Sequence, residues 1–141
     1  MPQRLVRAIY ASRTAPGFGL SMIEGILSSA RRHNSVADVT GLLTFSSEYF
    51  LQCLEGGRAA VNEIYARICR DDRHQDPQLL LYEECAERSF SQWSMGYVGE
   101  TALASETIRR FSAGSRFQPT HLGGAAALAL LEALAGSVKT S

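Results

Sequence analysis

The chain has 141 residues, 45% hydrophobic and 20% charged, and its 14 Lys and Arg balance its 14 Asp and Glu. This length and composition predict one soluble domain with a real core and a short appendage. The balanced charge, and the lack of a basic patch with interleaved aromatic residues, argue against a nucleic acid as a direct partner.

No stretch of the sequence predicts export or membrane insertion. The longest apolar run, 125–131, falls far short of the ~20 residues of a membrane span. Cys53, Cys69 and Cys85 are odd in number and widely spaced, which argues against a disulfide framework and a CxxC metal site. The histidines lack metal-ligand spacing, so no metal is assigned. We therefore expect a cytoplasmic protein.

The first predicted elements are a strand and an amphipathic helix. Alternation along the strand 5–12 puts Tyr10 and Ser12 on one face, and from the strand alone a tyrosine packed by its ring is the better interpretation. The helix is expected to begin at Ser21, because Ser21 and Glu24 fit a capping box. Its apolar stripe consists of Ile23, Ile26, Leu27 and Ala30.

The stretch 40–56, TGLLTFSSEYFLQCLEG, predicts two short strands joined by a polar turn at 46–48. Alternation puts Phe50, Gln52 and Leu54 on one face, so an amide lies between two large apolar side chains. On a buried face, an unpaired amide would cost roughly 1–3 kcal/mol, so the fold must supply partners. Two interpretations stay open for Gln52: an amide bonded to a neighbouring strand, or a contact to a polar ligand.

Polar residues also occur at the ends of the two long helices, the second of which is expected over 59–71. Asn34 falls on the apolar stripe of the first helix, either as a C-cap or as an amide aimed at whatever the stripe covers. Arg67 and Asp71 are four residues apart, which fits an exposed ion pair. The basic loop that follows is either solvated surface or a phosphate site.

Two more strands, 79–86 and 93–98, complete the order βαββαββ. Trp93, Met95 and Tyr97 are expected on one face of the last strand. This order indicates an α+β fold of the ferredoxin-like kind, a five-stranded mixed sheet with both helices on one face. Two C-terminal helices are expected to cover the other face, over 102–111 and 122–134.

Five stretches of the sequence together resemble the BLUF family, blue-light sensors that use flavin, and most of all its short stand-alone members. They are LVRAIYAS in the first strand, SARRHNSVADVTGLL at the end of the first helix, YFLQCLEG in the third strand, IYARICRDDRH at the second helix and ERSFSQWSMGY at the fifth strand. We therefore expect a photosensor domain over 1–99 and a helical extension over 100–141. One departure is His33, where many members have Asn.

The resemblance implies a flavin between the two long helices: FAD, with FMN and riboflavin as alternatives. It implies that Ile26 and Ile68 sandwich the ring. It also implies that Tyr10 and Gln52 form the photoactive pair beside it. The other implied cofactor contacts are Ser12, Arg32, His33, Asn34, Arg67, Asp71 and His74.

The same resemblance implies a photoreceptor rather than an enzyme. Light would drive electron and proton transfer from Tyr10 to the flavin and leave Gln52 rotated or tautomerised. Trp93 and Met95 would form a mobile pair that, with the C-terminal helices, passes the signal to a separate protein. No membrane is expected as partner, and a homodimer stays open. The alternatives are a small flavin-dependent oxidoreductase and a flavin-free binding module of the same fold.

Overall fold

A computed structural model describes residues 4–137. The first seven elements are β1 (Leu5–Thr14), α1 (Leu20–Ala37), β2 (Thr40–Phe45), β3 (Tyr49–Gly57), α2 (Arg58–Cys69), β4 (His74–Glu84) and β5 (Gly96–Val98). Helices α3 (Ser105–Phe111) and α4 (Gly124–Leu134) follow, with short 3-10 turns at Glu100–Ala102, Pro119–His121 and Ala135–Ser137. The predicted βαββαββ order is confirmed. Residues 1–3 of the expected photosensor domain and residues 138–141 of the expected helical extension lie outside the described residues.

The five strands form one mixed sheet in the order β4-β1-β3-β2-β5. All neighbours pair antiparallel except β2 and β5, which run parallel. In this register Tyr10 of β1 and Leu43 of β2 lie directly across from Gln52 of β3. Because directly paired residues point to the same face, the Tyr10 and Gln52 side chains lie next to each other at the centre of the sheet.

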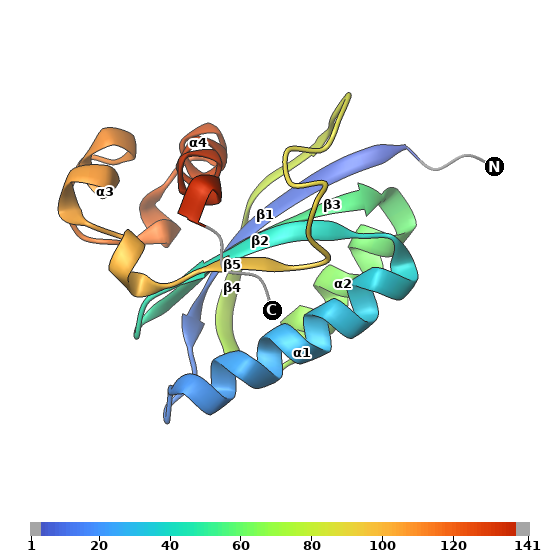
Figure 1. Cartoon of the computed structure of the whole chain (residues 1–141), viewed down its shortest axis with the longest axis horizontal. Helices are drawn as coiled ribbons and strands as arrows, with labels where there is room; N and C mark the ends of the chain where they lie inside the picture. The colour runs from blue at the N-terminus through green and yellow to red at the C-terminus, as the bar shows by residue number, and fades with distance from the viewer. Residues whose placement is uncertain (1–3, 138–141) are drawn as a thin grey trace.

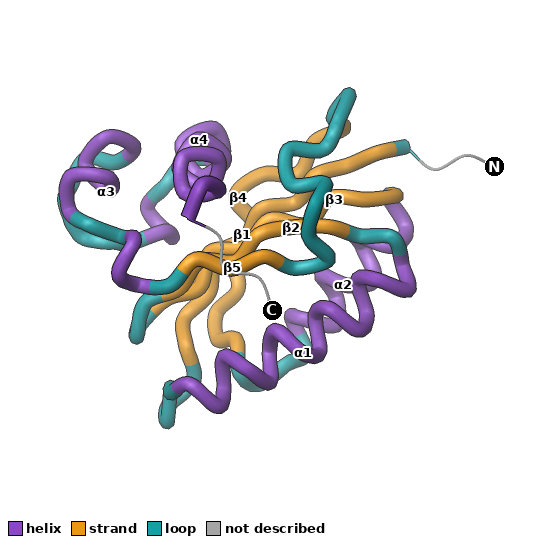
Figure 2. The backbone as a smooth tube through the Cα atoms, in the orientation of Figure 1, coloured by secondary structure: helices purple, strands orange, loops and turns teal. Residues whose placement is uncertain are grey.

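Helices cover both faces of the sheet, as predicted: α1 and α2 pack on one face, and α3 and α4 lie on the other (Figure 1). Alternation along β1 and β3 divides the apolar side chains between these layers. Tyr10, Phe50 and Leu54 belong to the core under α1 and α2. Ile9 and Leu51 belong to the core under α4. Figure 2 shows the loop that leads from β4 to β5 crossing the end of the sheet.

The starts of several elements differ from the sequence-based expectation; β5 and α3, for example, begin at Gly96 and Ser105 rather than at 93 and 102. Helix α1 begins at Leu20 after Gly19, whose position has no side-chain cap, so the capping box predicted at Ser21 is wrong. Strand β4 begins at His74, within the expected polar loop. It tolerates Pro77 because it is an edge strand, where a missing N–H leaves no ladder bond unmade.

Within residues 4–137, the helices are too short or too polar to cross a membrane. The same residues contain no group of three or more His, Cys, Asp or Glu side chains placed to hold a metal ion.

Candidate functional site

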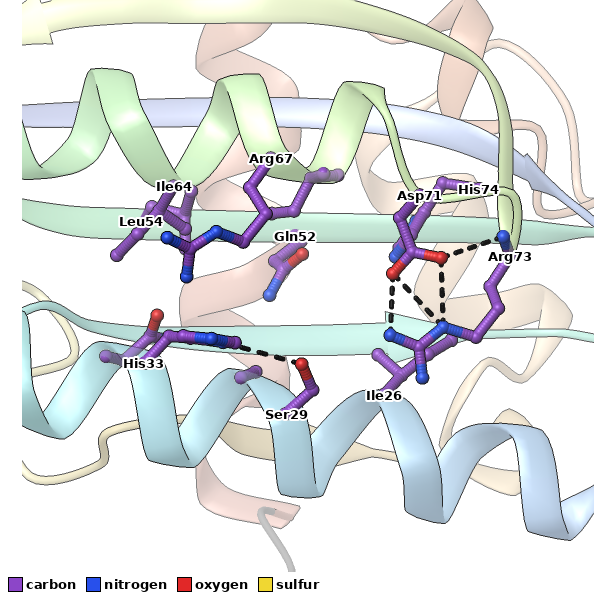
Figure 3. A pocket seen from close by; sticks show the side chains of 13 residues that line it. Ile26, Ser29, His33, Gln52, Leu54, Ile64, Arg67, Asp71, Arg73 and His74 are labelled. Atoms are coloured by element: carbon purple, nitrogen blue, oxygen red, sulfur yellow. Dashed lines mark hydrogen bonds and ion pairs between the residues drawn. The ribbon is translucent and has the colours of Figure 1, made fainter.

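A cleft lies between α1 and α2 above the centre of the sheet (Figure 3). It holds about 440 Å³ of space, its open mouth included. Ile26 of α1 and Ile64 and Ile68 of α2 line its walls, and Gln52 with Leu54 of β3 forms its floor. Apolar walls above a polar floor suit a flat aromatic molecule with a polar edge.

The amide of Gln52 is held between two buried side chains. The Tyr10 hydroxyl donates a hydrogen bond to Gln52 Oε1, and Gln52 Nε2 donates to the Met95 sulfur at 3.3 Å. Tyr10 is fully buried and Gln52 is 2% exposed. Burial, followed by nearby ionisable groups, raises the pKa of Tyr10 well above its usual value, so the hydroxyl keeps its proton. Sulfur is a weak acceptor, so one end of this amide is bound less firmly than the other.

Asn34 lies in the last turn of α1, which continues to Ala37 and ends at Asp38 in the left-handed region. The C-cap interpretation of Asn34 is therefore wrong. Its Nδ2 donates to the Ser94 carbonyl at 2.7 Å, whereas its Oδ1 is buried without a partner. Buried polar atoms in proteins are nearly always paired, so this acceptor at the edge of the cleft calls for a donor from a ligand or water.

An ion pair lies at the other end of the cleft. Asp71 accepts from the Arg73 guanidinium, with 2.6 Å between Oδ2 and Nη2. The hydrogen bond from Arg73 lowers the pKa of Asp71 below its usual value. The predicted pair of Arg67 with Asp71 is wrong, because Arg67 lies 3.6 Å from Glu63 instead. The Arg67 guanidinium therefore lies at the cleft, and its contact with Glu63 is long, exposed and weak.

His74 closes the inner wall beside this ion pair. Its ring centroid lies 4.6 Å from that of Phe50, and Nδ1 is 3.1 Å from Ser12 Oγ. Burial lowers the pKa of His74 to about 4, so the imidazole is neutral at pH 7. A neutral ring that bonds Ser12 joins β1 to β4 and offers no positive charge to a phosphate.

Residues 5–96 match the family described as sensors of blue light using FAD, or BLUF. The chain belongs to the BLUF family. It is 37% identical over 91 residues, 64% of its length, to the blue light- and temperature-regulated antirepressor BluF of Escherichia coli K12, and it spans only 23% of that protein.

Two solved structures match over nearly the whole chain. The photo-activated state of BlsA superposes with a TM-score of 0.87 at 28% identity, covering 97% of this chain and 99% of that one. The dark state of the BLUF protein BlrB superposes with a TM-score of 0.77 at 26% identity, covering 97% and 98%. These matches confirm the ferredoxin-like α+β fold and extend past the family match into the C-terminal helices.

The structure brings most of the residues implied by the BLUF resemblance into the cleft. Those that line it are Ile26, His33, Asn34, Gln52, Arg67, Ile68, Asp71 and His74. Tyr10 and Ser12 are buried just behind this lining. Arg32 is exposed and lines a neighbouring groove with Val36 rather than the cleft. Its placement argues against a ring contact.

Sequence reasoning missed several residues that line the cleft: Ser29, Ala30, Leu54, Ile64 and Arg73. Helical spacing offered a signal for Ala30, which is on the predicted apolar stripe of the first helix, and for Ile64, which is one turn before Ile68 on the second. The signal for Ser29 was its position one turn before His33, and in the structure the polar atoms of the two side chains are 3.5 Å apart. Arg73 had no such signal, since its place depends on how the turn after α2 folds back.

Trp93 and Met95 are not on one face, so that prediction is wrong. Met95 is buried in the core under α1 and α2, whereas Trp93 packs on the core under α4. Both precede β5, which begins at Gly96. The reason is local: alternation holds within a strand and not in the irregular segment that leads into it.

Proposed function

We propose that this BLUF protein binds FAD in the cleft between α1 and α2 and works as a light-driven hydrogen-bond switch that signals to a separate protein. The observation that carries the proposal is the Tyr10–Gln52–Met95 chain of contacts directly under the cleft. It joins a protonated phenol, an amide that can be reversed, and a weakly held sulfur.

The residues present fit a flavin ring. The ring is flat and largely apolar, which suits the space between Ile26 on one side and Ile64 and Ile68 on the other. Its polar edge carries an N–H and carbonyl oxygens, and the unpaired Oδ1 of Asn34 supplies an acceptor for that N–H. Arg67 and Arg73 at the cleft support a phosphate-bearing form, and FAD is the form that the family's description states.

The protein's part in the switch follows from its hydrogen bonds. Flavin, when bound, would supply an electron acceptor that blue light excites. Tyr10 is the buried phenol nearest the floor, and its hydroxyl proton already points at Gln52. Loss of an electron to that acceptor, and of the hydroxyl proton toward it through Gln52, would leave Tyr10 a poorer donor, so the Gln52 amide would be free to turn or tautomerise. Return of the electron and proton leaves Tyr10 unchanged and Gln52 in a new hydrogen-bond arrangement.

The signal leaves through the segment 93–95. A turned Gln52 no longer offers its NH₂ group to Met95, and neighbouring Trp93 touches the core under α4. One hydrogen bond is worth roughly 1 kcal/mol, whereas a shift from 1:99 to 99:1 needs about 5.5 kcal/mol. We therefore propose that the output is a modest change in affinity for a protein partner, with 100–141 as an extension of the sensor that takes part in the relay.

The cycle as proposed regenerates every group, so the chain is a switch without turnover. Three free cysteines favour a reducing cytoplasm as its compartment. Steady, light-independent oxidation of a reduced nicotinamide by the purified protein would contradict this part of the proposal.

Comparison of Gln52→Leu with the wild type tests the switch. Leu keeps the volume and removes the reversible amide, so the variant should bind flavin and lose the light-induced red shift of the visible bands. The matched control is Gln78→Leu, an exposed glutamine on β4, which should behave as the wild type. A normal shift in Gln52→Leu would refute the Gln-centred account.

A further inference from the structure

The three residues before β5 are fixed through their backbone carbonyls. Each carbonyl accepts a hydrogen bond of 2.7 to 3.1 Å from a donor elsewhere in the fold. The pairs are Trp93 O with Gly41 N, Ser94 O with Asn34 Nδ2, and Met95 O with Arg31 Nε. Two of the three donors are side chains of α1, so this helix holds the segment directly.

Arg31 is the charged member of this set. Its Nε lies 3.1 Å from the Met95 carbonyl, and among residues 4–137 it has no carboxylate within ion-pair distance. A hydrogen bond from an ionised donor is roughly twice as strong as a neutral one. Arg31 is half-buried and is not part of the cleft lining, so it acts on the switch only through Met95.

Met95 is therefore held at two points. Its backbone oxygen is bound by Arg31, and its sulfur accepts from Gln52 Nε2 at 3.3 Å. When the Gln52 amide turns, the sulfur loses its donor, and the Arg31 bond becomes the remaining side-chain restraint on Met95. The strength of that bond then determines how readily the segment returns.

We propose that Arg31 is a positioning residue that stabilises the resting arrangement of Met95 and so sets the lifetime of the light state. The inference rests on the proposed function. The Arg31–Met95 bond belongs to the resting arrangement, is weakened when the segment shifts, and re-forms on the way back. Its loss raises the barrier to return without altering the flavin's own contacts.

Two variants with similar stems separate the role of the hydrogen bond from that of packing. Arg31→Met keeps an unbranched side chain and removes the donor, whereas Arg31→Lys keeps a charged donor. The readout is dark recovery of the visible spectrum after a blue flash, with flavin affinity and the size of the red shift measured alongside. The control is Arg109→Met, which removes an exposed arginine from α3.

Arg31→Met should recover at least threefold more slowly than the wild type, with affinity and red shift retained. Arg31→Lys should recover at a rate nearer the wild type, and Arg109→Met at the wild-type rate. Unchanged or faster recovery in Arg31→Met, or equally slow recovery in Arg31→Lys, would overturn the inference alone. A wild-type protein that binds flavin and shows no reversible shift would overturn the proposed function and this inference with it.

Discussion

The Tyr10 hydroxyl donates a hydrogen bond to Gln52 Oε1 across the pairing of β1 with β3. Both side chains come from the centre of the sheet and both are buried. Their geometry therefore depends on the register of two long strands rather than on a mobile loop. A switch built this way can change its hydrogen bonds while its frame stays fixed.

Tyr10→Phe should bind flavin and lose the light-induced red shift. The ring still packs in the core, but the hydroxyl that carries the proton is gone, and Gln52 Oε1 is left without its donor. An unpaired buried acceptor costs about 1–3 kcal/mol, so the free energy of unfolding should fall by that amount. Difference spectra and urea denaturation measure the two effects. Tyr82→Phe, an exposed tyrosine on β4, is the control. A normal photocycle in Tyr10→Phe would exclude Tyr10 from the mechanism.

Asn34→Ala should weaken flavin binding about tenfold, the loss expected for a buried hydrogen bond worth ~1.4 kcal/mol. The variant removes the unpaired Oδ1 at the cleft and also the donor to the Ser94 carbonyl. Titration of the flavin-free protein with FAD measures the affinity. Asn62→Ala, an exposed position on α2, should leave it unchanged. Equal affinity in Asn34→Ala would show that Asn34 does not contact the ring.

The regular part of the fold was predictable because its signals are local. Periods of two and about 3.6 residues located the strands and helices, and alternation alone put Gln52 on the same face as Phe50 and Leu54. The errors occur where the partner of a side chain depends on how the chain folds rather than on spacing in the sequence. The partner of Asp71 is Arg73 rather than Arg67, because the turn after α2 folds back on itself.

The site was predictable only as a set of odd residues. Each of Tyr10, Gln52 and Asn34 has an ordinary explanation when considered alone, and the BLUF resemblance supplied the reason to group them. Their contacts depend on strand register and on helix length, which sequence patterns fix to within a few residues at best. Asn34 shows the consequence. Because α1 continues for three residues beyond Asn34, this side chain does not cap the helix and lies at the cleft instead.

His74 should make the protein less stable in mild acid. Its pKa is about 4 in the folded protein, against 6.5 for an exposed histidine, so the unfolded chain binds more protons between these values. Stability is complete above pH 6.5 and falls as the pH drops toward 4, by on the order of 3 kcal/mol. The lowered pKa of Asp71 affects stability only below pH 3.8, the usual pKa of this group, which is outside this window.

Urea denaturation between pH 4.5 and 7.5, at a fixed saturating flavin concentration, measures this dependence. His74→Phe should flatten it, because the apolar ring fits beside Phe50 and cannot be protonated. The exposed His121 provides the control: His121→Phe should keep the wild-type slope. A wild-type slope in His74→Phe would assign the dependence to another group.

Glu55→Ala should cost about 3–5 kcal/mol of folding stability. The fully buried carboxylate lies 2.8 Å from Arg7 Nε and accepts the backbone N–H groups of Ser89 and Phe90. Its removal leaves Arg7, which is 6% exposed, with the partly exposed Glu83 as its remaining ion-pair partner. The exposed pair of Arg4 and Glu84 is the contrast, since Glu84→Ala should cost about 1 kcal/mol or less. Similar losses in the two variants, measured by urea denaturation, would contradict this assignment.

The most direct test of the account is the visible absorption spectrum of the FAD-loaded protein, recorded in darkness, immediately after blue illumination, and during recovery in the dark. A hydrogen-bond switch at Gln52 predicts flavin bands that move slightly to the red, keep their intensity and return. Bands that bleach or stay in place, or a protein that takes up no flavin, would contradict it.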